Sequence, residues 1–295
     1  MKTLKKLALP TLFILFATAF ALAPKMFCTA FIQGLTVWAN NVLPVLLPFC
    51  LLAPPACKAL PQKGKLTRFL FGQSADGLFV TSLVCGYPVG AKLVADSGAK
   101  GKTAVALSAF CSTPGPIFLL ATVCPLLENV VASAILVGTQ LVACLLNGLI
   151  FRSQTSCITG MPNPTRNAKN FSETLTDSVL SVLTVGALIG IAYMISYAVK
   201  SILPDSFADS LTAAFFCGLL EMTSGVFFVT AATTDTLAQT VLCSTLLGFG
   251  GIGILLQSMS FLSRCKVRSI EYLKTKLTQS SLCAIISYLL CKLFL

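Results

Sequence analysis

Residues 86–90 read Gly-Tyr-Pro-Val-Gly and lie at the middle of a largely apolar segment, Ser74 to Ser97. A second segment, Ser206 to Thr234, carries the stretch Gly218 to Gly225 at its middle, with Glu221 inside it. Each arm beside these centres is about ten residues long, and a helical arm of that length spans roughly 15 Å, half of the hydrocarbon core of a bilayer. The two segments are therefore predicted to be re-entrant helical hairpins, which turn near the midplane and leave the membrane by the side they entered.

The composition of the chain is typical of a membrane protein. Apolar residues make up 56% of the 295 residues and charged residues only 11%, whereas soluble domains contain roughly 25% charged residues. Besides the two hairpin segments, long apolar spans are predicted at residues 28–57, 103–127, 129–151, 177–203, 237–262 and 276–295. The predicted fold is an all-α polytopic membrane protein with the lipid bilayer as its partner.

The first 24 residues have two interpretations. Lysines within residues 2–6 precede the apolar run Leu7–Ala23, which resembles a secretory signal peptide with a small-residue cleavage motif at residues 21–23. Pro24 would follow the cut and is a poor cleavage context. Residues 1–24 are therefore interpreted as an uncleaved N-terminal transmembrane helix, with the signal-like segment as the alternative.

Positive charge orients the chain in the membrane. The formal net charge is +11, but the basic residues lie between apolar spans rather than on one face, so nucleic-acid binding is not expected. With a cytoplasmic N-terminus and two re-entrant hairpins, all 21 basic residues except Lys25, Lys200 and Lys292 lie on the cytoplasmic side. The positive-inside rule therefore favours re-entrant hairpins over full crossings and places the C-terminus outside.

The same elements occur twice along the chain. Residues 28–151 and 177–295 each contain a long span, a hairpin, an interrupted span and a final span, and a cytoplasmic linker, 152–172, joins the two halves. The interrupted spans carry Pro114-Gly115-Pro116 and Gly250-Gly251. One Gly/Pro cluster is also typical of a simple helix kink, but paired interruptions in corresponding positions indicate two inverted repeats and a transporter's binding site.

Broken helices survive in a membrane only where they line a cavity or pack on protein, because lipid cannot satisfy free backbone groups. The N-terminal N–H groups of a broken helix carry partial positive charge and favour anionic or carbonyl-bearing solutes. The backbone breaks predicted to line the site are Gly86, Pro88, Gly90, Gly115, Pro116, Gly218, Gly225, Gly250 and Gly251.

Glu221 is the only acid within an apolar segment and away from its ends. A charge at the bilayer centre costs at least about 2.5–3.5 kcal/mol on insertion scales, so a role in binding the solute or a coupling Na⁺ or H⁺ is predicted. The alternative is a protonated Glu that is hydrogen-bonded within the bundle. Thr223 and Ser224 add hydroxyl groups beside it.

Four further polar residues each have a binding and a structural interpretation. The amide of Gln257 either binds the solute or bonds neighbouring helices. Ser112 and Thr113 precede a break and supply oxygens to the solute or cap a helix. Lys92 either pairs with an anionic solute or extends along apolar surface to the cytoplasmic face.

No catalytic site, metal site or cofactor is predicted. The chain contains no His, which excludes Ser-His and zinc-protease mechanisms. Its 13 Cys include none of the closely spaced pairs that are typical of zinc sites.

Two stretches of the first half carry a resemblance to a known family. Gly86 to Lys92 and Phe110 to Phe118 look like the two signatures of the sporulation integral membrane protein YlbJ family, which belongs to the nucleoside-recognition (Gate) domain group. Gly218 to Gly225, together with Gly248 to Gln257, is similar to that group's second-half signature. The resemblance covers about residues 30 to 290.

This resemblance implies a Gate fold in which the solute is held between hairpin tips and broken helices. It also implies a role in spore formation, where family members are thought to move dipicolinate across a forespore membrane. Ser112 and Pro114 stand where the family usually has Asn and Ser, and the long central loop is reduced to residues 152–172. These departures bear on the substrate more than on the fold.

Two functions follow from the sequence. The first is a secondary transporter, in the cell or forespore membrane, of a small polar or anionic solute such as dipicolinate or a nucleoside-like compound. The alternative is a non-transporting membrane protein that assembles with or regulates a partner complex. An enzyme is not expected, because no nucleophile–base pair is visible; the oligomeric state is left open, with a homo-oligomer among the alternatives.

Overall fold

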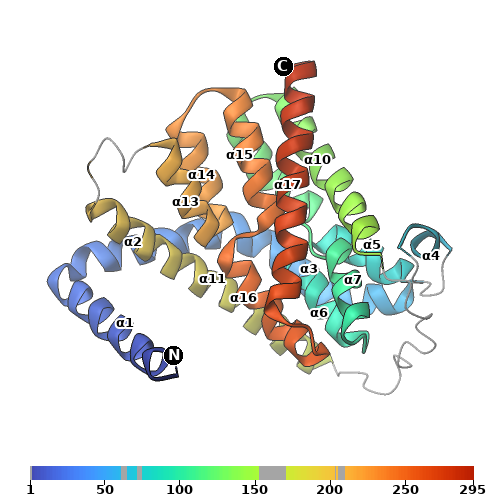
Figure 1. The fold of residues 1–295 in the computed structure, drawn as a ribbon, viewed down its shortest axis with the longest axis horizontal. Helices are drawn as coiled ribbons and strands as arrows, with labels where there is room; N and C mark the ends of the chain where they lie inside the picture. The colour runs from blue at the N-terminus through green and yellow to red at the C-terminus, as the bar shows by residue number, and fades with distance from the viewer. Residues whose placement is uncertain (1, 61–64, 72–74, 153–170, 203, 205–209) are drawn as a thin grey trace.

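The computed structural model describes all residues except 1, 61–64, 72–74, 153–170, 203 and 205–209 (Figure 1). Every element in this part of the chain is a helix. Six helical stretches are long and apolar enough to cross a membrane: Pro24–Cys57, Lys102–Leu127, Val130–Ile150, Ser172–Val199, Thr236–Cys265 and Ser269–Phe294. The chain is a multi-pass membrane protein, as its composition predicts.

The last helix, α17 (Ser269–Phe294), has the polarity of a helix that packs on protein inside and on lipid outside. Its buried residues are mostly polar or small: Tyr272, Thr275, Lys276, Gln279, Ser280, Cys283, Ser287 and Cys291. Its exposed large side chains are mostly apolar: Ile270, Leu277, Ile285, Tyr288, Leu289, Leu293 and Phe294. A soluble amphipathic helix has the opposite arrangement, so the outer surface of α17 is suited to the bilayer.

The start of the last helix differs from the predicted one. The helix α17 begins at Ser269 rather than near residue 276, because Arg268 and Glu271 form a capping box that starts the helix in what looked like a charged loop. At the N-terminus, α1 (Lys2–Leu22) lies within the predicted segment 1–24. The linker prediction at 152–172 lies largely outside the described residues.

In the first half, a long helical span is followed by a pair of short helices, an interrupted helix and a final long helix. Its elements are α2 (Pro24–Val37), the π-helical turn η1 (Trp38–Val42), α3 (Leu43–Ala59), α4 (Leu66–Phe71), α5 (Asp76–Cys85), α6 (Val89–Asp96), α7 (Lys102–Cys111), α8 (Pro116–Phe118), the π-helical turn η2 (Leu119–Val123), α9 (Cys124–Leu127) and α10 (Val130–Ile150). The helices α2 to α3 run on without an interruption and form the first long span.

The second half repeats this order of elements. It contains α11 (Phe171–Ile202), α13 (Leu211–Leu220), α14 (Met222–Ala232), α15 (Thr236–Phe249), α16 (Gly251–Leu262), the short turn η4 (Ser263–Cys265) and α17. In both halves a long helix precedes a pair of short helices, then an interrupted helix, then another long helix. The breaks predicted from the Gly and Pro clusters are therefore present in the structure.

Each pair of short helices folds back on itself. The helices α13 and α14 lie side by side (Figure 1), and a Cβ atom added to Gly225 would overlap the Cα atom of Gly218. In the first half, a Cβ atom on Gly90 of α6 would lie 3.3 Å from the Cβ atom of Ser82 on α5. Glycines thus permit the close approach of the two arms in both pairs.

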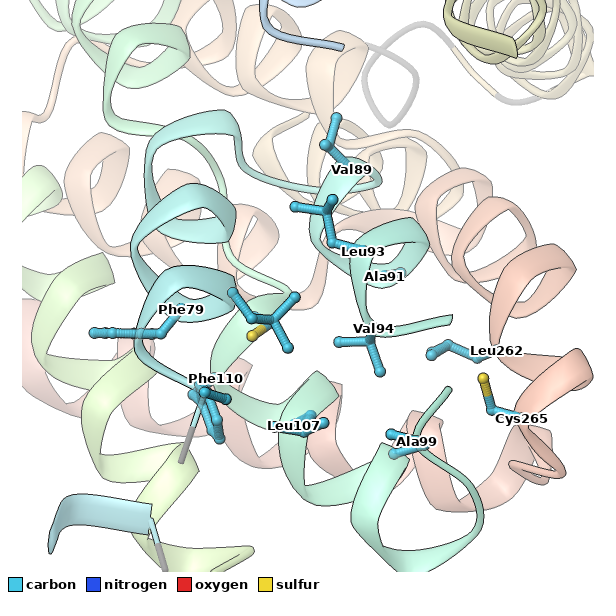
Figure 2. Packing of buried hydrophobic residues seen from close by; sticks show 14 of the residues in the cluster. Phe79, Val89, Ala91, Leu93, Val94, Ala99, Leu107, Phe110, Leu262 and Cys265 are labelled. Atoms are coloured by element: carbon cyan, nitrogen blue, oxygen red, sulfur yellow. The ribbon is translucent and has the colours of Figure 1, made fainter. Parts of the chain in front are cut away.

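The two halves share a core around α6. Figure 2 shows Val89, Leu93 and Val94 of α6 among side chains of the same hydrophobic cluster. The cluster includes Leu107 and Phe110 from α7 of the first half, and also Leu262 at the end of α16 and Cys265 in the turn η4 of the second half. The short helix α6 is therefore packed between an element of its own half and one of the other half.

The long helices α2 and α11 pack closely through small residues. A Cβ atom on Gly186 would lie 2.7 Å from the ring of Trp38, and one on Gly190 would lie 2.5 Å from the ring of Phe31. Gly34 in turn lies against the backbone of Gly190. Small residues allow this approach of membrane helices in the same way as in other helix pairs of the bilayer.

Candidate functional site

Four helix breaks form the candidate site. Break one lies between α5 and α6 at residues 86–88, break two between α7 and α8 at residues 112–115, break three between α13 and α14 at Glu221, and break four between α15 and α16 at Gly250. All of these residues are buried. Buried breaks agree with the rule that irregular backbone at membrane depth packs on protein or lines a cavity.

Breaks one and two are in direct contact. The backbone N–H of Tyr87 donates to the carbonyl of Thr113 at 2.9 Å. Gly86 has a φ of 74°, and a Cβ atom there would overlap the backbone nitrogen of Gly115. Only glycine fits at position 86, because both its left-handed backbone and the closeness of break two exclude a side chain.

Breaks three and four are also in contact. Gly251 has a φ of 73°, and a Cβ atom there would lie 3.0 Å from the nitrogen of Met222 and 3.2 Å from the Cα atom of Glu221. Tyr87 connects this pair to the first half: its hydroxyl donates to the carbonyl of Leu247 at 3.1 Å and lies 3.3 Å from the sulfur of Met222. The four breaks therefore converge on one region.

The unwound end of α7 has its free carbonyl groups satisfied by side chains. The amide of Asn147 donates to the carbonyl of Ala109 at 2.8 Å. The ammonium group of Lys276 donates to the carbonyl of Ser112 at 2.8 Å. The hydroxyl groups of Ser112 and Tyr272 lie 2.6 Å apart. Asn147 and Lys276 thus supply donors that the end of the broken helix lacks, and Lys276 and Tyr272 both belong to α17.

Sequence reasoning missed Lys276. It was counted with the cytoplasmic basic residues at the start of a span, whereas the structure places it inside α17 with only 1% of its surface exposed. That assignment is wrong because the helix begins earlier than predicted. The signal that could have found it is a polar stripe at helical spacing: Tyr272, Lys276, Gln279, Cys283 and Ser287.

Glu221 acts as the N-cap of α14. One carboxylate oxygen accepts from the N–H of Thr223 at 2.9 Å, and the other accepts from the N–H of Ser224 at 2.7 Å. The hydroxyl of Ser224 donates to the carbonyl of Glu221 at 2.9 Å. A carboxylate has about four lone-pair sites, so the cap leaves acceptor capacity for a further group.

A small cavity lies between the tips of the two helix pairs, and we call it cavity one. It has a volume of about 40 Å³. Its lining includes Pro88, Gly115, Glu221, Met222 and Thr223, which belong to or adjoin breaks one, two and three. A volume of this size holds a few waters, whereas pockets for organic ligands have about 300–1,000 Å³.

A larger cavity, cavity two, shares Pro88 with cavity one and has a volume of about 320 Å³. Its polar and charged lining comes from three helices: Lys92, Asp96, Asp177, Ser181, Thr184, Gln257, Ser260 and Arg264. Gln257 is 6% exposed, and its carbonyl oxygen has no hydrogen-bond partner. Cavity two therefore offers charges of both signs and an unsatisfied buried acceptor.

The predicted site residues are thus distributed over two cavities and the helix ends beside them. Lys92 and Gln257 meet in cavity two, and Glu221 and Thr223 meet in cavity one. Ser112 and Thr113 line neither cavity. Neither of them caps α8, whose N-cap is Gly115 without a side-chain hydrogen bond, and Ser112 is the C-cap residue of α7.

Gly115 and Pro88 line cavity one. The glycines at 86, 90, 218, 225, 250 and 251 permit close packing around the breaks and lie outside the cavity linings. Pro116 begins α8 directly after break two. Among the described residues, no group of three or more metal-ligating side chains is present.

No known protein family, curated protein or solved structure matches the chain.

Proposed function

We propose that the protein is a secondary transporter of a small polar or anionic solute, built from two inverted repeats with re-entrant hairpins. The observation that carries this proposal is the convergence of four buried helix breaks, two from each half of the chain. Discontinuous helices at corresponding positions of two halves are typical of the substrate and ion sites of transporters.

The breaks provide the chemistry for such a site. The helices α6, α14 and α16 each begin at a break, so their N-terminal N–H groups carry partial positive charge in the interior of the bundle. At α14 the carboxylate of Glu221 already occupies this place. The other helix starts and the charged groups of cavity two remain suited to a carboxylate or another polar group of a solute.

The two cavities support a route rather than a single pocket. Cavity two has the volume for a small organic solute, and cavity one, at the tips, has room only for a few waters. In this proposal, movement of the helix pairs about Pro88 enlarges cavity one and admits the solute from cavity two. Alternating access then corresponds to rocking of one half against the other.

The choice of solute rests on the resemblance to the YlbJ family of the Gate group. It favours dipicolinate and other small carboxylates, with nucleosides as a second class, and it proposes a place in the cell or forespore membrane. The proposed topology has a cytoplasmic N-terminus and an external C-terminus.

The first experiment is thermal stabilisation of the purified protein by dipicolinate, other small carboxylates and nucleosides, followed by uptake into proteoliposomes. A ligand that binds the folded state adds roughly 2.7 kcal/mol of stability at a hundredfold excess over its Kd. We expect one ligand class to stabilise the protein and to be taken up, and both effects to be lost in Glu221→Gln but not in Glu271→Gln. If none of these ligands stabilises the protein or is taken up, the result would contradict the proposal and favour a protein that assembles with a partner complex.

The proposed topology has its own test. In a variant without native cysteines, a cysteine introduced at Lys65 and one at Lys100 flank the first helix pair, and both native positions are exposed. Re-entrance predicts that an impermeant thiol reagent labels both from the same side, and that a cysteine at Thr234 is labelled from the opposite side. Labelling of positions 65 and 100 from opposite sides would show a full crossing.

A further inference from the structure

Lys276 carries a buried amine whose neighbours are neutral, electron-rich groups. Its ammonium group donates to the carbonyl of Ser112 and to the side-chain oxygen of Gln279, each at 2.8 Å. The same nitrogen lies 5.2 Å from the centre of the Tyr87 ring, at a distance where a cation is attracted by the aromatic face. All three contacts suit a positive charge, and each comes from a different part of the chain.

No carboxylate contacts this ammonium group in the described structure. The buried acid of the site, Glu221, uses both carboxylate oxygens to cap α14, and the contacts of Lys276 are to neutral groups. Carbonyl oxygens are the groups with which membrane proteins bind dehydrated monovalent ions. Two of the three contacts of Lys276 are oxygens of this kind.

The position of the ammonium group agrees with this comparison. The carbonyl of Ser112 belongs to break two, just beyond the C-terminal end of α7, where the helix carries partial negative charge. A Cβ atom on Gly250, at break four, would lie 3.8 Å from the Cε atom of Lys276. Unwound carbonyl groups and half-helix C-terminal ends are the groups that coordinate coupling cations in transporters with broken helices.

We propose that the ammonium group of Lys276 occupies a monovalent-cation site formed by Ser112, Gln279 and Tyr87, as an ion tethered to α17. The consequence for coupling rests on the proposed transport function: a site that is permanently filled by Lys276 does not bind Na⁺, so transport needs no Na⁺ at this position. The cation site itself can be tested by binding alone, whether or not the protein transports a solute.

The experiment removes the tethered ion and offers a free one. Lys276→Ala deletes the side chain beyond Cβ, and n-propylammonium has the same carbon chain and charged group as the deleted part. We expect the Tm of the purified variant to fall by roughly 10 °C, because a hydrogen-bonded buried charge is lost. We expect n-propylammonium to recover at least about half of this fall and to leave the wild-type Tm unchanged.

Two controls separate charge from volume. The neutral molecule 1-propanol fills the same space without a charge, so it should not raise the Tm of Lys276→Ala. Lys276→Met fills the space within the protein, so it should be destabilised and should not respond to the amine. If Lys276→Ala folds only when it is produced and purified with n-propylammonium, that rescue equally supports the cation site.

Three outcomes would overturn the cation site: a Lys276→Met variant as stable as the wild type, equal rescue of Lys276→Ala by 1-propanol and by n-propylammonium, or no rescue by the amine. Coupling has a separate readout, which is uptake by the wild type after choline replaces Na⁺. Unchanged uptake supports the tethered ion, and loss of uptake overturns its consequence for coupling. Failure to observe uptake in any buffer contradicts the transport function and leaves the result of the binding test intact.

Discussion

The tips of the two helix pairs occupy corresponding places in the two halves, but they are held by different chemistry. The first tip contains no charge: Tyr87 donates its N–H to Thr113 and extends its hydroxyl across to Leu247 of the second half. The second tip is held locally, because the carboxylate of Glu221 binds the N–H groups of its own helix, α14. The first tip therefore depends on the other half, whereas the second is largely self-sufficient.

This difference indicates how the same order of elements can form two tips that respond differently to movement of their neighbours. A tip that is capped by its own carboxylate keeps its shape when its neighbours move. A tip whose hydroxyl donates to α15 of the other half must exchange that partner if the halves rearrange. In the proposed transport cycle, the first tip is therefore the element whose hydrogen bonding changes with the position of the second half.

Among the substitutions that test this difference between the tips, Gly90→Ala should cause the largest loss of stability. A Cβ atom at position 90 would overlap the carbonyl oxygen of Cys111, so α6 cannot stay packed on α7. We expect a loss of about 3 kcal/mol or more in the free energy of unfolding, from overpacking of a buried helix contact. Size-exclusion profiles and thermal melts measure the folded fraction.

Gly138→Ala is the matched control, because it also lies in a helix and a Cβ atom there meets no atom within 4 Å. It should be neutral or stabilise the protein by up to about 1 kcal/mol through helix propensity. Equal stability of the two variants would contradict the contact between α6 and α7.

Glu221→Gln should have the next largest effect, because it keeps the shape of the second tip but removes one acceptor. One of the two backbone N–H groups of α14 then faces an amide nitrogen and loses its partner. We expect a cost of about 2 kcal/mol, the penalty for an unsatisfied buried donor. Thermal unfolding should show a smaller loss of stability for Glu271→Gln, whose carboxylate forms a surface ion pair with Arg268.

Tyr87→Phe tests the link from the first tip to the second half. It removes the hydroxyl that donates to Leu247 and leaves the ring in place. We expect a loss of about 1 kcal/mol in stability, the net value of one hydrogen bond. Tyr288→Phe, at an exposed position of α17, should change the melting temperature little. A cost as small as that of Tyr288→Phe would mean that the first tip is also self-sufficient.

Gln257→Leu should have the smallest effect on stability and a clear effect on binding. The carbonyl oxygen of Gln257 has no partner to lose, so we expect a stability change within about 0.5 kcal/mol. Affinity for the stabilising ligand should fall by about tenfold if this oxygen binds it. Gln140→Leu provides the contrast, because the amide of Gln140 donates to the carbonyl of Ser244 and its loss should lower stability without a change in affinity.

The sequence was sufficient to predict an all-helical membrane protein and the positions of the breaks, because both depend on local composition. Apolar runs predict spans, and Gly and Pro clusters predict interruptions. The start of α17 was not predictable from hydropathy, because the charged residues at its N-terminus are typical of a loop. The capping box that starts the helix there depends on side-chain geometry that hydropathy does not contain. The π-helical turn Trp38–Val42 has no comparable signal in its residue types.

For the site, sequence reasoning found the charge but not its surroundings. Glu221 was evident as an acid in an apolar segment, but its role as a cap depends on the extended backbone at that position. Lys276 was missed because its partners lie far away in the sequence, at Ser112 and Tyr87, and only the packing of α17 against break two brings them together. Pairings of this kind are tertiary and leave no local pattern.

The close packing of α2 on α11 also provides an optical reporter. Trp38 is the only tryptophan of the chain, and its indole ring lies against Gly186 of α11. The preceding residue, Val185, lines cavity one between the tips of the two helix pairs. Indole emission depends on the polarity and packing around the ring, so a movement of α11 that opens this cavity should change the intrinsic fluorescence of the unlabelled protein. The chain therefore carries its own signal for following conformational change in real time, before any solute is known.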